Sequence, residues 1–150
     1  LTRSQSKELI DTYYQTYPKL KGYIEKQIAF AREHGYVETI LGRRRYLPDV
    51  YSRNQVVRGA AERNAVNAPI QGSAADIIKI AMVRIAQRLE REHLATRMLL
   101  QVHDELLFDV PKPELEVVTP IIREEMQQAY KLSVPLIVEI GTGNNWLEAH

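Results

Sequence analysis

Three side chains suited to metal chemistry stand together at His103-Asp104-Glu105, within the stretch "QVHDELLFDV". The apolar run "MLLQV" precedes them and "LLFDV" follows, so both flanks are expected to be buried strands of one tight hairpin. Adjacent carboxylates beside a core are costly unless a cation neutralises them. Carboxylate oxygens suit Mg²⁺ or Mn²⁺, and Mg²⁺ completes its shell with water and substrate phosphate. The pattern is compatible with phosphoryl transfer. On these three residues alone, an ordinary acidic turn with an exposed histidine is the stronger interpretation.

A second polar pattern lies in "ERNAVNAPIQGSAAD", where Arg63, Asn67 and Gln71 recur every four residues. All three side chains donate hydrogen bonds. The minor groove of DNA offers purine N3 and pyrimidine O2 acceptors at every base pair, so a donor row could hold a duplex regardless of its sequence. A solvated polar helix face explains the same spacing, and the row alone does not decide between the two.

Arginines cluster in "GRRRY", residues 42–46, which places three guanidinium groups on a predicted turn. Guanidinium groups bind phosphate through paired hydrogen bonds, so Arg44 and Arg45 are candidate DNA contacts beside Arg43. The net charge of +1 hides a segregation: residues 41–69 hold six arginines against two acids, and residues 98–150 hold three bases against nine acids. This predicts a strip facing a polyanion and an acidic corner that binds cations. Solvated faces of opposite sign remain the alternative.

Length and composition fit one typical domain, with 150 residues and a hydrophobic content of 45%. The absence of cysteine excludes disulfides and thiolate metal sites. No apolar run reaches the roughly 20 residues of a membrane span, and the N-terminus has no hydrophobic signal region. We therefore expect a cytoplasmic location. Because the chain begins with Leu1 rather than Met, we expect it to be a piece of a longer protein.

The expected elements indicate an α+β fold, with helices packed on a small antiparallel sheet that contains the tight hairpin. Thr2 and Gln5 are spaced as a capping box that opens the first helix, and Gly35 suits a left-handed cap that ends the second. Ser52 and Gln55 are spaced as another capping box, and Pro69 limits the helix that they open. Helices are expected at about 2–16, 19–34, 52–69, 73–92 and 114–131, the last kinked by Pro120, and strands at about 36–41, 97–102, 106–110 and 134–140.

Four segments in order, "YVETILGRRRYLPD", "AERNAVNAPIQGSAADIIK", "LLQVHDELLFDV" and "VPLIVEIGTGNNW", resemble the C-terminal part of the polymerase region of family A DNA polymerases, the bacterial DNA polymerase I type. The resemblance covers essentially the whole chain. It implies that residues 1–57 are the C-terminal part of the fingers subdomain and that residues 58–150 are the C-terminal part of the palm. It also implies roles in DNA replication and repair.

The resemblance assigns roles to individual residues. Asp104 takes the position of a ligand to the catalytic metals, and Glu105 that of the adjacent acid, which supports the metal site less directly. His103 matches a residue near the primer terminus. Arg63, Asn67 and Gln71 match side chains that follow the minor groove of the primer–template. The implied partners are primer–template DNA and deoxynucleoside triphosphates, and the implied cofactors are two Mg²⁺ ions, with Mn²⁺ also possible.

Parts of the family's site have no match in this chain. The other metal-binding aspartate lies in a "DYSQIELR"-like segment, and the nucleotide-binding helix would precede Leu1. We therefore expect the isolated chain to be inactive, and to self-associate through exposed surfaces such as the face of Tyr13, Tyr14 and Tyr17. Two other hypotheses are a non-catalytic module that binds duplex DNA and a one-metal hydrolase built on the His-Asp-Glu turn.

Overall fold

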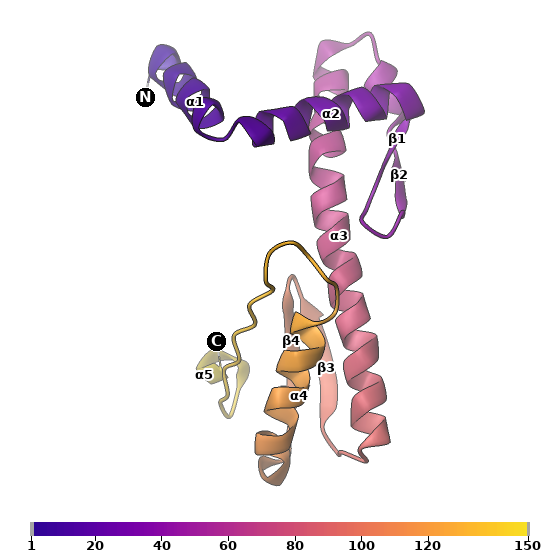
Figure 1. The fold of residues 1–150 in the computed structure, drawn as a ribbon, viewed down its shortest axis with the longest axis vertical. Helices are drawn as coiled ribbons and strands as arrows, with labels where there is room; N and C mark the ends of the chain where they lie inside the picture. Colours follow the sequence, from indigo (N-terminus) through magenta and orange to yellow (C-terminus); the bar gives the residue numbers. More distant parts are fainter. Residues whose placement is uncertain (1, 150) are drawn as a thin grey trace. The chain divides into compact units, whose positions relative to one another are not determined.

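The structure, a computed structural model, describes residues 2–149. Its elements in chain order are α1 (Arg3–Thr16), α2 (Pro18–His34), β1 (Tyr36–Glu38), β2 (Arg44–Tyr46), η1 (Pro48–Tyr51), α3 (Gln55–Arg91), β3 (Arg97–Val102), β4 (Glu105–Asp109), η2 (Lys112–Glu114), α4 (Leu115–Gln127) and α5 (Trp146–Ala149) (Figure 1). They form two compact units, Leu1–Ser73 and Ala74–His150, and the border falls inside α3. The predicted subdomain border at residue 57 is a different division and stays a prediction.

The predicted α+β class is confirmed, but the strands form two separate antiparallel sheets instead of one. Among the residues described, β1 pairs with β2 and β3 pairs with β4, and each pair is a hairpin. Helices account for most of the chain. Over the same residues, no helix combines the length and the apolar character that crossing a membrane would require.

The ends of the first two helices follow the chemistry of their capping residues. Thr2 caps α1, and its side chain and that of Gln5 form the predicted reciprocal capping box. Pro18 occupies the first turn of α2, where its missing N–H costs nothing. Gly35 ends α2 with φ 76°, a left-handed conformation that favours glycine.

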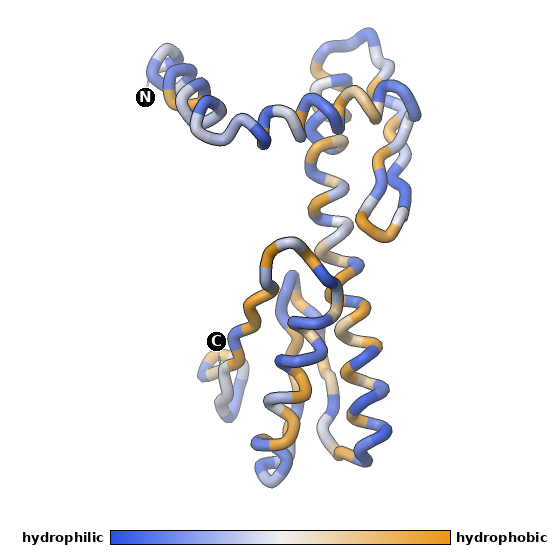
Figure 2. The backbone as a smooth tube through the Cα atoms, viewed as in Figure 1, coloured by the Kyte–Doolittle hydropathy of each residue, from blue (hydrophilic) through white to orange (hydrophobic). Residues whose placement is uncertain are grey.

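The apolar face predicted for α1 exists, but it is exposed. Figure 2 colours α1 as mainly hydrophilic, and no described residue of this helix is buried. Tyr13 packs its ring against those of Tyr14 and Tyr17, with centroid distances of 6.0 and 5.0 Å. Leu9 and Ile10 are each more than half exposed. Tyr13 and Tyr17 are exposed as expected, at 52% and 55%, whereas Tyr14 is half-buried.

One continuous helix, α3, replaces the two helices predicted at 52–69 and 73–92. The residue that caps its N-terminus is Asn54, and not the predicted Ser52. The Asn54 side chain accepts a hydrogen bond from the Val56 N–H at 2.9 Å, and the Asn54 carbonyl accepts one from the Arg58 N–H. Pro69 lies inside the helix without ending it. A proline interior to a helix costs about 3 kcal/mol, and the hydrogen bonds and packed faces of a helix this long offset that cost.

The core of the first unit is built on a face of small residues. Ala61, Ala65 and Ala68 of α3 are buried against Ala31 of α2 and Val37 of β1. Alanine side chains let neighbouring backbones approach closely, so α2 and the β1–β2 hairpin seat directly on this face of α3. The hydroxyl of Tyr23 adds a hydrogen bond of 3.2 Å to the Val66 carbonyl. The opposite face of α3 is thereby fixed toward solvent.

The core of the second unit lies between helices and the β3–β4 hairpin. Its buried members are Ile85 and Leu89 of α3 and Val118 and Ile122 of α4. One face of the hairpin packs against them through partly buried side chains, those of Met98, Leu106 and Phe108. The other face is more open, and Leu99 and Leu100 are each about half exposed, at 54% and 50%. The prediction that both hairpin strands are buried is thus correct for one face only.

The strand predicted at 134–140 is wrong as a strand, although its alternation is real. Leu136, Val138 and Ile140 are half-buried while Ile137 and Glu139 are exposed, as an extended segment with one inward face requires. No ladder joins this segment to other described residues. Alternation sets the faces of a segment, but a strand also needs a hydrogen-bonding partner, and the alternation does not supply one. Ile140 still packs against the core of the second unit.

Candidate functional site

The turn of the β3–β4 hairpin carries the predicted metal-binding residues. Val102 pairs with Glu105, so the loop consists of His103 and Asp104 alone, and Glu105 is the first residue of β4 and not part of the turn. His103 has φ 53°, the left-handed conformation that the first position of a tight hairpin loop favours. The Gln101 side-chain amide donates to the His103 carbonyl at 2.5 Å. A short, braced loop therefore presents all three side chains at one end of the hairpin.

His103, Asp104 and Glu105 are all exposed. No cluster of three metal-ligating side chains occurs in the part of the chain that the structure describes. A hard cation at this turn would take one or two carboxylates from the chain, with water and phosphate oxygens as its other ligands.

The donor row lies on the solvent face of α3, in the first unit. Arg63, Asn67 and Gln71 are exposed, and they recur along one helix with a rise of about 6 Å per step. Sequence reasoning placed Gln71 beyond a break at Pro69, whereas the structure extends the row through it. Within residues 2–149, none of the three side chains makes a hydrogen bond or ion pair. Their donors are therefore available to a ligand.

The three arginines of residues 43–45 differ in their surroundings. Arg44 lies on β2 and donates from Nε to Glu38 at 2.8 Å, with its guanidinium 4.4 Å from the centre of the Tyr36 ring. Hydrogen bonds to Glu38 and then to Tyr46 raise the pKa of Arg44 above its ordinary value. Arg45 is exposed and makes no such bond with the described residues. Of these two candidate phosphate contacts, Arg45 is thus the less engaged within the chain, and Arg44 is held in one orientation.

The loop between β1 and β2 docks onto α3 beside Gln71. Arg43 donates from Nη2 to the Gly72 carbonyl at 3.0 Å, and the Ile40 N–H donates to the Ser73 hydroxyl at 2.9 Å. A Cβ at Gly72 would lie 2.5 Å from Cγ2 of Thr39, so only glycine allows this approach. The arginine cluster and the end of the donor row are thereby held together in the first unit.

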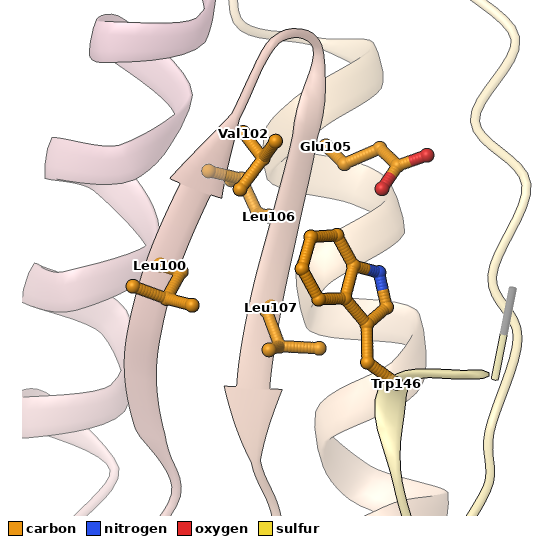
Figure 3. A pocket seen from close by; sticks show the side chains of 6 residues that line it. All are labelled: Leu100, Val102, Glu105, Leu106, Leu107 and Trp146. Atoms are coloured by element: carbon orange, nitrogen blue, oxygen red, sulfur yellow. The ribbon is translucent and has the colours of Figure 1, made fainter. Parts of the chain in front are cut away.

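Sequence reasoning did not identify two positions that shape these sites. The role of Gly72 depends on a contact with Thr39, 33 positions earlier, which the local sequence does not reveal. The side chain of Trp146, at the end of the segment "VPLIVEIGTGNNW", lies against the β3–β4 hairpin (Figure 3). The sole tryptophan of the chain was the available signal, but its sequence position did not reveal its contact.

Comparison with known proteins decides the family. The sequence model of DNA polymerase family A matches residues 1–148. The chain belongs to DNA polymerase family A.

Curated relatives agree with this assignment. DNA polymerase I of Caldicellulosiruptor bescii is 46% identical over 148 residues, which is 99% of this chain and 17% of that protein. The thermostable DNA polymerase I of Thermus aquaticus is 49% identical over 145 residues, 97% of this chain and 17% of that protein. The chain therefore spans about a sixth of the length of these family A relatives.

A solved structure supports the same conclusion at the level of the fold. The POL domain of Pol1 from M. smegmatis, in complex with DNA primer–template and dNTP, matches with a TM-score of 0.97 and 46% identity. The match covers 99% of this chain and 26% of that one. The chain is thus similar to one segment of a DNA polymerase I type polymerase domain. The alternative of a non-catalytic DNA-binding module is not favoured.

Proposed function

We propose that this segment serves a template-directed DNA polymerase, which adds deoxynucleotides to a primer 3′ end by metal-dependent phosphoryl transfer. The observation that carries the proposal is the match of nearly the whole chain, at 46% identity, to a polymerase domain solved with primer–template and dNTP. The proposed partners are accordingly primer–template DNA and deoxynucleoside triphosphates. Because the chain spans 17% of its curated relatives, we propose the activity for the larger polymerase and none for this chain alone.

In this proposal the hairpin turn contributes charge at a fixed position. Asp104 would offer carboxylate oxygens to a divalent ion, Mg²⁺ or Mn²⁺, and Glu105 would support it as the neighbouring acid. A bound ion supplies electrostatic stabilisation of the charge that develops on the transferred phosphoryl group. Asp104 sits in a two-residue loop that is held by the β3–β4 ladder and by the bond from Gln101 to His103. Few loop residues leave little freedom, so the backbone that carries the Asp104 side chain would be in place before substrate arrives.

The first unit would hold the duplex in this proposal. Arg63, Asn67 and Gln71 would donate to minor-groove acceptors that every correct base pair offers, which explains binding without sequence preference. Arg45, and Arg44 in its oriented state, would contact backbone phosphates. His103 would lie near the primer terminus.

Primer extension by the polymerase that carries this segment tests the proposal. We expect templated, Mg²⁺-dependent extension by the unchanged enzyme, and a loss of at least about a hundredfold in Asp104→Asn, because an ion at this position supplies several kcal/mol of transition-state stabilisation. Affinity for primer–template should stay within about twofold, since the binding row is intact. Normal turnover by Asp104→Asn would contradict the proposed role.

A further inference from the structure

The β3–β4 hairpin packs on the core with one face only, and Trp146 of the C-terminal segment lies against part of its other face. Residues paired in register share a face of an antiparallel hairpin, so Leu100 with Leu107, and Val102 with Glu105, form the face directed away from the core. A cavity of ≈ 20 Å³ lies on this face. Of the six side chains that line it, only Trp146 comes from outside the hairpin.

The indole of Trp146 lies along this face, next to the residue that follows the proposed metal ligand. Figure 3 shows the ring beside Leu107 and Glu105, on the same side of the hairpin. The space between them is a small, partly open pocket with room for about one water molecule, so the indole lies close to the hairpin without sealing its face. Trp146 remains 44% exposed, which means that one side of the ring covers the hairpin and the other faces outward.

The segment that carries Trp146 is itself held in a defined shape. Glu148 accepts from the Asn144 N–H at 2.9 Å and from the side-chain amides of Asn144 and Asn145, and its own N–H donates to Asn145 Oδ1. These bonds lower the pKa of Glu148. A Cβ at Gly143 would lie 2.5 Å from Cβ of Glu148, so glycine is needed for this fold of the chain. At the other end, Ile140 packs on the core.

We propose that Trp146 is a positioning residue that clamps the outer face of the hairpin and thereby holds Glu105 and the adjacent Asp104 in place for metal binding. The predicted effect on metal binding rests on the proposed function, whereas the predicted effect on the motion of the hairpin rests on the packing of Trp146 alone. The core side chains fix one face of the hairpin, and the indole restricts its motion on the other. Without the indole, the loop of His103 and Asp104 would be fixed from one side only.

The first test measures the hairpin itself and needs no activity. Hydrogen exchange of the amides of residues 97–109 is compared among the unchanged polymerase, Trp146→Ala and Leu147→Ala. Leu147 is the matched control, because it follows Trp146 on α5 and is 89% exposed. We expect protection of the hairpin to fall at least about tenfold in Trp146→Ala, and to stay unchanged in Leu147→Ala. Unchanged protection in Trp146→Ala would overturn the proposal, whatever the activity.

The second test measures the effect on the metal. Primer extension is followed against Mg²⁺ concentration for the same enzymes and for Trp146→Phe. Groups that support metal ligands typically change metal affinity or activity by about 10–100-fold, so Trp146→Ala should raise the Mg²⁺ concentration for half-maximal rate by that factor. Primer–template affinity should not change, and Trp146→Phe should recover most of the loss. A Mg²⁺ curve unchanged in Trp146→Ala would overturn the proposal.

These outcomes separate the clamp from the proposed function. If Trp146→Ala does not fold, Trp146→Leu replaces it, with the same expected and contradicting results. If the unchanged enzyme extends primers and Asp104→Asn does not, a normal Trp146→Ala refutes the clamp alone. If the unchanged enzyme fails to extend primers, the proposed function is refuted, and hydrogen exchange still decides the clamp.

Discussion

Replacing Gly72 by alanine should destabilise the chain, although the same change at another glycine of the same helix should stabilise it. Alanine in a helix interior is favoured over glycine by about 0.5–1 kcal/mol. At Gly59 the nearest atom to an added Cβ is Arg63 Nη1 at 3.7 Å, an ordinary contact, so Gly59→Ala should gain that amount. At Gly72 the added Cβ would lie 2.5 Å from Thr39 Cγ2, about 1 Å closer than carbon atoms normally approach.

The Thr39 side chain cannot easily move away from a Cβ added at Gly72. Thr39 is β-branched and therefore stiff at χ1, and its Oγ1 accepts from the Arg43 N–H at 3.2 Å. Overpacking of this kind costs about 1–3 kcal/mol, which exceeds the gain in helix propensity over most of that range. In a Thr39→Ser background Cγ2 is absent, and the next atom from the added Cβ is Arg43 Nη2 at 3.5 Å. There Gly72→Ala should stabilise, as Gly59→Ala does.

Urea denaturation followed by circular dichroism measures all five proteins: the unchanged chain, the two glycine variants, Thr39→Ser, and the double variant. The coupling free energy between positions 39 and 72 should be about 1–3 kcal/mol. Equal gains in Gly72→Ala and Gly59→Ala would refute the close approach. So would a Gly72→Ala variant whose stability does not respond to Thr39→Ser.

Two further predictions concern the second unit. Arg88 contacts Glu92, Glu124 and Glu125 at 3.0, 2.6 and 3.0 Å. Arg88→Met would leave these three carboxylates close together, so it should lower the urea midpoint, and added salt should reduce the loss. Arg91→Met serves as the control. Glu114 accepts from the Thr96 hydroxyl and from the Ala95 and Thr96 N–H groups, which lowers its pKa. Because the pKa of Glu114 is lower in the folded state than its unfolded value of about 4.3, this carboxylate stabilises the fold at higher pH, and the stabilisation is lost as the pH falls through the folded pKa. Glu114→Gln should therefore flatten the decline in the free energy of unfolding below about pH 4. An identical acid profile in the variant would count against this.

Helix ends could be predicted from the sequence where a single capping residue determines them. The capping box of Thr2 and the left-handed Gly35 depend on neighbours within a few positions, so the sequence contains the whole interaction. The tight hairpin was predictable for the same reason, because only two residues separate the paired Val102 and Glu105. Its site residues, being exposed at the turn, followed from the hairpin.

Predictions failed where distant contacts decide. Pro69 normally ends a helix, and only the length and packing of α3 show why it does not here. The segment at 134–140 has a strand's alternation, but pairing is a property of the partner and not of the segment. The contacts of Gly72 with Thr39 and of Trp146 with Leu107 join residues more than 30 positions apart, which no local pattern encodes.

Anomalous diffraction can show whether Asp104 binds a catalytic metal ion. Crystals of the polymerase that carries this segment, grown with primer–template, nucleotide and Mn²⁺, would locate the ion independently of any model of the protein. We expect a manganese peak about 2 Å from a carboxylate oxygen of Asp104, and none at that position in Asp104→Asn. Full occupancy of nucleotide and primer with no manganese beside Asp104 would contradict it.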